Sequence, residues 1–327
     1  MTDQQVIKIL EQAPAKLSAF GKEVAKVIVG QQDAVDLITQ SILVGGHSLL
    51  IGVPGLAKTL LITTVSKALG LDFSRIQFTP DLMPTDITGT EVLNKERTFE
   101  FRKGPVFANV VLADEINRTP PKTQAALLEA MQEKRVSIGG VSYDLPKPFF
   151  VLATQNPIEQ EGTYPLPEAQ MDRFLFKVRV DYPDALAELS IVRMLQEEES
   201  GGEATLESID PQAIFTAREE IQKIAVAEPV EKYLIDIVMA TRNPTQFSNS
   251  LGSWISVGSS PRASIALHRA CRAEAWLQGR DYVLPEDVRA VAPPVLRHRL
   301  ILSYDAMADG VDSDTVVNEI LSLVAAS

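Results

Sequence analysis

One stretch of the sequence decides the fold, Gly52-Val53-Pro54-Gly55-Leu56-Ala57-Lys58-Thr59. It follows the apolar segment 48–51 and leads into the apolar-rich segment 60–65. This order predicts a strand, a glycine-bearing turn and a helix. In such a turn the backbone N–H groups point into a concavity at a helix N-terminus, where an anion is favoured. The stretch therefore predicts a phosphate-binding loop in an α/β fold.

The residues of this loop have distinct expected roles. We expect Lys58 to reach the β- and γ-phosphates of a nucleotide, and the Thr59 hydroxyl to ligate Mg²⁺. The expected phosphate contacts comprise the loop and the first helical residues: Gly52, Val53, Pro54, Gly55, Leu56, Ala57, Lys58, Thr59 and Leu60. The general pattern has glycine where this chain has Ala57. The alternative interpretation is an ordinary strand–helix turn with a solvated lysine.

A second signal is an apolar run that ends in two carboxylates, Val110-Val111-Leu112-Ala113-Asp114-Glu115. Continuous apolar residues are typical of a strand that is buried in a parallel sheet. Ligands of open α/β sheets bind at the carboxyl ends of the strands, where Asp114 falls. We expect Asp114 to hold Mg²⁺, directly or through water, and Glu115 to polarise a water for in-line attack on the γ-phosphate. The alternative, carboxylates that only solvate a strand end, is opposed by the upstream loop.

Composition excludes several classes of protein. The chain has 327 residues, of which 45% are hydrophobic and 23% charged, as is typical of a globular protein with two domains or one large domain. The net charge of −12 opposes a broad electrostatic footprint for nucleic acid or for an anionic membrane. The N-terminus lacks the pattern of a signal peptide, and no apolar run is long enough to span a membrane.

The cysteine and histidine content points to a reducing compartment and to no metal cluster. The one cysteine, Cys271, cannot build a disulfide framework, so we expect a cytoplasmic protein. His47, His268 and His298 are scattered without metal-ligand spacing. We interpret each histidine as structural or solvated.

Between residues 47 and 180, apolar strand patterns alternate with helix-like runs. The strand candidates are 48–52, 73–78, 108–113, 149–154 and 174–180. This alternation predicts a parallel sheet with helices on both faces. Two hairpins are expected to interrupt it. One lies within 85–107, where residues 98–102 alternate strictly, and the other spans 135–143, with its turn at Gly139-Gly140.

The pattern changes after Pro183-Asp184, a pair that is typical of a helix start and of a domain hinge. Strand patterns vanish, and the Ser/Gly-rich stretch 248–260 is expected to be a loop. Helix-like runs cover 185–199, 211–224, 229–242, 262–279 and 285–297. We therefore expect an α/β core over residues 1–183 and a smaller all-α domain over residues 184–327.

Three polar residues outside the two motifs have candidate roles. Asn156 follows an apolar strand pattern, and its amide could orient the attacking water, although Asn-Pro also initiates simple turns. Arg173 could supply positive charge to the phosphoryl group held by a neighbouring subunit, unless it pairs with a carboxylate such as Asp172. Arg262 follows Pro261 at a helix start, where its charge opposes the helix dipole. A phosphate contact from the second domain would offset that cost.

Two features remain open at this point. The apolar turn Ile28-Val29-Gly30-Gln31 either floors an adenine pocket through Val29 and Gly30 or simply packs as a turn. Arg118 either acts across a subunit interface or stabilises its own loop.

The chain resembles the MoxR family of AAA+ ATPases over nearly its whole length. The resemblance rests on the loop with Ala57, on Asp-Glu-Ile-Asn-Arg at 114–118 and on Ala-Thr-Gln-Asn-Pro at 153–157. It also rests on Glu-Ala-Gln-Met-Asp-Arg-Phe at 168–174 and on Ser-Pro-Arg-Ala at 260–263. Alanine before the lysine is normal in this family, so the departure in the loop no longer counts against activity.

The resemblance implies a P-loop AAA+ core with a parallel sheet and inserted β-hairpins at 85–107 and 134–145, followed by a helical lid. Lys58 and Thr59 resemble Walker A, Asp114 and Glu115 resemble Walker B, Asn156 resembles sensor 1, Arg173 the trans-acting finger and Arg262 sensor 2. The family also implies ATP and Mg²⁺ as ligands and a homo-oligomeric ring, a hexamer, with nucleotide at the subunit interfaces. It further implies chaperone-like maturation of metal- or cofactor-containing enzymes, often with a von Willebrand factor A-domain partner.

The expected function is therefore ATP hydrolysis that drives remodelling of a protein client. One alternative is a nucleic-acid or restriction-type motor, which only the basic cluster Lys95, Arg97, Arg102 and Lys103 of the first hairpin favours. The other is a nucleotide-gated scaffold with little turnover, against which the presence of Glu115 and Arg173 argues.

Overall fold

The structure is a computed structural model that describes residues 20–21, 23–53, 56, 58–95, 97–157, 162–199, 206–208 and 210–326. These residues fall into two compact units. The core unit contains residues 20–166 and 178–213, and the helical unit contains residues 167–177 and 214–326. The predicted boundary after residue 183 stays a prediction. The bounds of the compact units do not coincide with this boundary, because residues 185–199 lie in the core unit and residues 167–177 lie in the helical unit.

A five-stranded sheet forms the centre of the core unit, in the strand order β2-β5-β8-β1-β9, although the first two residues of its last strand, Phe176 and Lys177, fall in the helical unit. The register of β2 with β5, of β5 with β8 and of β8 with β1 is parallel. Each strand coincides with one of the predicted strands: β1 (Ser48–Ile51), β2 (Phe73–Gln77), β5 (Val110–Asp114), β8 (Phe150–Gln155) and β9 (Phe176–Arg179). The side chains of Val110, Val111 and Leu112 are fully buried, as a strand covered on both faces requires.

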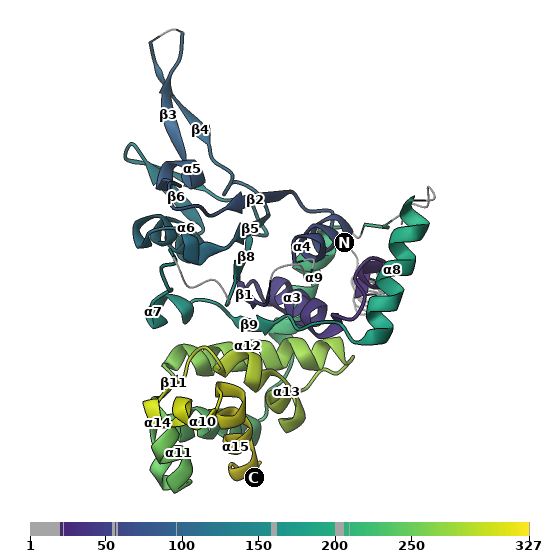
Figure 1. The fold of residues 1–327 in the computed structure, drawn as a ribbon, viewed down its shortest axis with the longest axis vertical. Helices are drawn as coiled ribbons and strands as arrows, with labels where there is room; N and C mark the ends of the chain where they lie inside the picture. The colour runs from purple at the N-terminus through teal and green to yellow at the C-terminus, as the bar shows by residue number, and fades with distance from the viewer. Residues whose placement is uncertain are drawn as a thin grey trace. The chain divides into compact units, whose positions relative to one another are not determined.

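Helices cover both faces of this sheet. In Figure 1, α3 (Gln32–Val44) and α4 (Lys58–Ala68) lie on one side of the sheet and α6 (Pro121–Glu133) lies on the other. The buried face of α3 carries Val35, Ile38 and Ile42 at helical spacing. Further helical elements of the core unit include α5 (Pro84–Thr88), the 3₁₀ turn η1 (Ile116–Arg118) and α8 (Ala185–Glu199). The predicted parallel sheet with helices on both faces is therefore confirmed.

Both predicted hairpins are present and lie side by side in the core unit (Figure 1). The first pairs β3 (Gly89–Leu93) with β4 (Phe99–Lys103), and the second pairs β6 (Arg135–Ile138) with β7 (Val141–Asp144). The ring of Phe101 stacks on the ring of Tyr143, with their centroids 4.2 Å apart. This aromatic contact joins the two hairpins, because one ring comes from each.

The helical unit consists mainly of helices, as predicted. Its elements are α7 (Glu168–Met171), α9 (Gln212–Lys223, from Ile214 onward), α10 (Glu228–Arg242), η2 (Pro244–Gln246), α11 (Asn249–Trp254), α12 (Pro261–Leu277), α13 (Pro285–Leu296), α14 (Tyr304–Ala308) and α15 (Ser313–Leu323). It also contains the two short strands β10 (Ile255–Val257) and β11 (Ile301–Leu302), which pair antiparallel.

Two expectations about this unit are wrong. The stretch 248–260 is not a continuous loop, because it holds α11 and β10. The Ser248 hydroxyl caps α11 by accepting from the Ser250 N–H, and Leu251 and Ile255 are buried. Strands do not vanish after residue 184 either, since β10 pairs with β11. That pairing joins segments far apart in the chain, so no local pattern could reveal it.

Candidate functional site

The carboxyl ends of four parallel strands meet at one edge of the core sheet. The register pairs Ile51 of β1 with Gln155 of β8, and it pairs Gln77 of β2 with Asp114 of β5. The residues that follow these strands therefore lie at the same edge, which is where open α/β sheets bind ligands. Gly52, Asp114, Glu115 and Asn156 are all brought together in this way, as predicted from the sequence.

Lys58 begins α4 at this edge. Its Nζ donates to the carbonyl oxygen of Gly52 at 2.5 Å. Burial lowers the pKa of Lys58, and the negative charges of Asp114 and Glu115 oppose that shift. A cation that is partly desolvated at a helix N-terminus, and near two carboxylates, is suited to bind an anionic phosphate together with a metal ion.

The loop before Lys58 allows little room for side chains. A Cβ atom on Gly52 would lie 2.5 Å from the carbonyl oxygen of Val180, so only glycine fits there. The Gln31 side chain donates to the carbonyl of Leu56 at 3.1 Å and holds the loop from the outside. Of the predicted phosphate contacts, Pro54, Gly55 and Ala57 lie outside the described residues, whereas Val53 and Thr59 are half-buried and Leu60 is exposed.

Both carboxylate oxygens of Asp114 accept hydrogen bonds. Oδ1 accepts from the Thr154 hydroxyl at 2.6 Å. Oδ2 accepts from Nη2 of Arg75 at 2.6 Å and from Nε of the same side chain at 3.2 Å. Sequence reasoning missed Arg75 and Thr154. Thr154 lies within the Ala-Thr-Gln-Asn-Pro run, but Arg75 carries no local signal, because its partner lies 39 residues away.

Glu115 adopts a left-handed backbone conformation with a φ angle of 56°. Such a conformation costs a non-glycine residue about 1–3 kcal/mol and is concentrated at functional sites. The Glu115 N–H donates to the Thr154 hydroxyl at 2.8 Å. Its Oε2 accepts from Nη1 of Arg118 at 2.9 Å and from the Gln77 amide at 3.0 Å. Arg118, whose role was open, thus holds the Glu115 carboxylate within its own chain.

The remaining predicted residues of the core unit occupy different surroundings. Asn156 follows β8 directly and is buried. Gly30 has a φ angle of 77°, and a Cβ atom there would lie 2.8 Å from the Cβ of Ala187 in α8. The turn that contains Val29 and Gly30 thus packs closely on α8, and its contact with an adenine ring stays a prediction.

Arg173 and Arg262 belong to the helical unit. Arg173 follows α7 and is half-buried. Arg262 lies in the first turn of α12 and is exposed, and its N–H donates to the hydroxyl of the N-cap residue Ser260 at 3.1 Å. The other predicted catalytic and metal-binding residues all lie in the core unit.

The donor set of the core unit fits a magnesium ion with a phosphate ligand. The Asp114 carboxylate and the Thr59 hydroxyl supply oxygen atoms, which Mg²⁺ prefers. Among the described residues, no cluster of three or more acidic, histidine or cysteine side chains could form an all-protein metal cage. A Mg²⁺ ion here would therefore complete its shell with phosphate oxygens and water, as is usual for nucleotide sites.

No helix in the described part of the chain combines the length and the apolar character that crossing a membrane requires.

Comparisons with known proteins agree with this geometry. Residues 47–176 match the family described as "ATPase family associated with various cellular activities (AAA)", and residues 253–320 match the AAA lid domain. Chaperone MoxR1 of Mycobacterium tuberculosis is 48% identical over 93% of this chain and 80% of its own length. Protein MoxR of Methylorubrum extorquens is 36% identical over 86% of this chain and 87% of its own. The crystal structure of a putative ATPase from Cytophaga hutchinsonii matches with a TM-score of 0.92 and 46% identity over 98% of both chains.

Proposed function

Because the chain belongs to the MoxR family of AAA+ ATPases, we propose that it hydrolyses ATP to ADP and phosphate to remodel or mature a protein client. One observation carries the hydrolysis part of this proposal. Lys58 at the start of α4 lies near Asp114 and Glu115 at the carboxyl edge of the sheet, close enough for both charges to affect its pKa. A phosphate-binding cation, a metal-binding carboxylate and a base are thus grouped at one edge.

Each residue of the group has a specific role in the proposed reaction. Lys58 binds the β- and γ-phosphates, and Thr59 and Asp114 hold Mg²⁺. The metal ion, when bound, neutralises charge on the phosphate oxygens. Glu115 accepts the proton of the attacking water, which forms the new bond to the γ-phosphorus while the bond to the ADP oxygen breaks. Both hydrogen bonds from Gln77 and Arg118 go to Oε2 of Glu115, so Oε1 is the oxygen we assign to the proton.

The remaining residues orient the attacking water or bring positive charge to the nucleotide. Asn156 orients the attacking water through its amide. Arg262 contacts the nucleotide of its own subunit from the lid, and Arg173 supplies positive charge to the phosphoryl group held by the neighbouring subunit. This arrangement requires a homo-oligomeric ring, which we propose to be a hexamer.

The proposed action on a client protein is inferred from the names of the relatives. One of them is called a chaperone, and we propose chaperone-like work for this chain as well. The client is proposed to be a metal- or cofactor-containing enzyme or complex, with a von Willebrand factor A-domain protein as partner. The exposed Leu93 and Phe99 on the β3–β4 hairpin offer apolar surface for a client.

The test is ATP turnover as a function of protein concentration, with sedimentation in parallel. We expect the specific activity of the wild type to rise as the ring assembles. Glu115→Gln should retain ATP binding and lose turnover by about 10²-fold or more, because the base is removed while the shape is kept. Arg173→Ala should bind ATP and assemble but lose turnover by about 10³-fold.

Two outcomes would contradict the proposal. Turnover that is independent of concentration and of Arg173 would mean that each subunit has a self-contained site. Unchanged turnover in Glu115→Gln would remove the assigned base.

A further inference from the structure

The tripeptide Arg297-His298-Arg299, which follows α13, binds the backbone of segment 172–177 within the helical unit. Nη2 of Arg299 donates to the carbonyls of Phe174 at 2.6 Å and Asp172 at 3.2 Å, and its Nη1 donates to that of Leu175 at 3.1 Å. Nε2 of His298 donates to the Phe174 carbonyl at 3.1 Å, and Nη1 of Arg297 donates to that of Lys177 at 3.1 Å. One short stretch therefore satisfies the carbonyls on both sides of Arg173.

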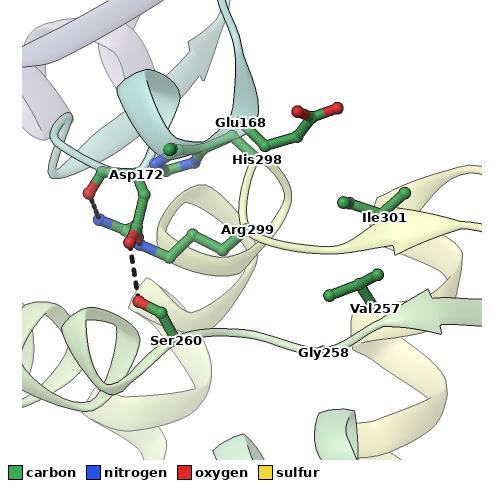
Figure 2. Close-up of a pocket in the computed structure, with 9 residues that line it drawn as sticks. Glu168, Asp172, Val257, Gly258, Ser260, His298, Arg299 and Ile301 are labelled. Atoms are coloured by element: carbon green, nitrogen blue, oxygen red, sulfur yellow. Dashed lines mark hydrogen bonds and ion pairs between the residues drawn. The ribbon is translucent and has the colours of Figure 1, made fainter.

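The Asp172 side chain extends this network to the start of α12. Its Oδ1 accepts from Nε of Arg299 at 2.8 Å, and its Oδ2 accepts from the Ser260 hydroxyl at 2.7 Å (Figure 2). The same Ser260 oxygen caps α12 by accepting from the Arg262 N–H at 3.1 Å. One carboxylate thus connects the residue before Arg173 with the helix turn that carries Arg262.

Arg299, at the centre of this network, is buried and fully hydrogen-bonded. Only 3% of the Arg299 side chain is exposed, and all three of its nitrogens donate hydrogen bonds. Burial, together with the nearby charge of Arg262, lowers the pKa of Arg299 to about 10, and the charge and hydrogen bond of Asp172 oppose that shift. Arg299 therefore stays protonated at neutral pH. Removing one partner of a buried ion pair strongly destabilises the folded protein, because the other charge stays buried without compensation. An exposed pair lacks this penalty.

We propose that Asp172 and Arg299 are positioning residues for ATP hydrolysis. They hold the backbone of Arg173 and join it to the N-terminus of α12, so that Arg173 and Arg262 move as one body. This inference rests on the proposed function, in which Arg262 contacts the nucleotide of its own subunit and Arg173 acts on that of the neighbour. A change at one nucleotide site then reaches the next site around the ring through the Asp172 carboxylate.

The first experiment compares Asp172→Asn with a matched control, Asp287→Asn. Asp287 also forms an ion pair in the helical unit, and its carboxylate accepts from both terminal nitrogens of Arg280 at 2.7 and 2.5 Å. It is a suitable control because it takes no part in the hydrogen bonds to segment 172–177 described above. Both substitutions should lower the melting temperature. Only Asp172→Asn should lower kcat, by about 10- to 100-fold as expected for a misplaced catalytic group, with KM for ATP and ring assembly retained.

A double-mutant cycle tests whether Arg299 acts through Arg173. Arg299→Lys should lower kcat in the wild-type background and cause no further loss in the Arg173→Ala background. Equal kcat values for Asp172→Asn and Asp287→Asn would overturn the positioning role, and so would additive losses in the cycle. Neither result would contradict the proposed function itself. If assembled Arg173→Ala instead keeps wild-type turnover, Arg173 does not act on the neighbouring subunit's nucleotide, and that part of the proposed function is wrong.

A milder pair of variants covers the case in which the buried substitutions fail to fold. Ser260→Ala removes the link from Asp172 to α12, and Ser260→Thr keeps the hydroxyl. Ser248→Ala is the control, because Ser248 caps α11 through the same contact, accepting from the N–H two residues on at 3.2 Å. We expect a lower kcat in Ser260→Ala, recovery in Ser260→Thr and no change in Ser248→Ala. Equal kcat values in all three would overturn the link.

Discussion

At the scale of single residues, both carboxylates of the candidate site are paired with arginines of their own chain. Arg75 donates to Asp114 and also to Gln77, and Gln77 in turn donates to Glu115. The two carboxylates are therefore linked through residues of strand β2. Any metal ion that binds Oδ2 of Asp114 directly must displace the guanidinium of Arg75. We infer that this arginine competes with Mg²⁺.

This competition predicts a change in the Mg²⁺ requirement. The Arg75 side chain is 47% exposed, and exposed ion pairs are worth about 0.2–1 kcal/mol. Arg75→Gln should therefore lower the Mg²⁺ concentration for half-maximal binding of a fluorescent ATP analogue by about twofold to fivefold. The control is Arg102→Gln, which removes the same charge from β4 of the first hairpin. An equal Mg²⁺ dependence in both variants and the wild type would show that Arg75 does not compete.

At the scale of elements, the tripeptide that follows α13 contains a titratable group, His298, whose neutral form makes the hydrogen bond in the network. His298 is buried and donates to the Phe174 carbonyl. Burial, with help from the adjacent charge of Arg299, lowers the pKa of His298 well below its ordinary value of 6.5. Protonation of His298 in the folded state is therefore unfavourable compared with protonation in the unfolded chain.

The stability of the protein should consequently fall with acidification. Below pH 6.5 the unfolded chain binds a proton at residue 298 that the folded chain does not, so stability falls as the pH falls. The contribution of this histidine approaches about 1.4 kcal/mol per pH unit between pH 6.5 and its lowered pKa. Urea midpoints at pH 7 and pH 5 measure the effect in the wild type and in His298→Gln, which keeps an N–H donor.

The matched control for this measurement is His268→Gln. His268 is not buried, and its Nε2 lies 3.6 Å from Oε1 of Glu231. The difference between the urea midpoints at pH 7 and pH 5 should be smaller in His298→Gln than in the wild type, and it should be unchanged in His268→Gln. If the difference shrinks equally in both, the acid sensitivity does not arise from the end of α13.

At the scale of the whole molecule, the proposed machinery is divided between two compact units. Lys58, Asp114, Glu115 and Asn156 belong to the core unit, and segment 172–177 with α12 belongs to the helical unit. We propose that hydrolysis at Glu115 changes the angle between the units. That motion then passes through the ring to the hairpins, which act on the client.

This model predicts a nucleotide-dependent distance between the units. Donor and acceptor dyes can be attached at the exposed positions of Lys67→Cys in α4 and Met307→Cys in α14. Burial raises the pKa of the native Cys271 thiol to about 12, so that cysteine should not react with the dyes. Energy transfer should differ between ATP-bound Glu115→Gln and the ADP-bound protein. Equal transfer in the two states would eliminate the lid-motion model.

Periodicity and local motifs sufficed to predict most elements of the fold. The apolar runs before Gly52 and Asp114 predict β1 and β5, and strict alternation over 98–102 predicts β4. The first signal works because a strand buried on both faces is apolar throughout. The alternation located β4 correctly, although only Phe101 of its residues is half-buried and the other four are exposed. The same reasoning failed at 248–260, where serine and glycine suggest a loop, although Leu251 and Ile255 are buried in the helical unit.

The sequence by itself determined which residues end the parallel strands, and so it placed Lys58, Asp114, Glu115 and Asn156 at one sheet edge. It did so because all strands of a parallel sheet end on the same side. Only the tertiary structure decided which distant charges meet: Arg75 with Asp114, 39 residues away, and Arg299 with Asp172, 127 residues away. These two ion pairs depend on distances between segments remote in the chain, and no local pattern of residues encodes those distances.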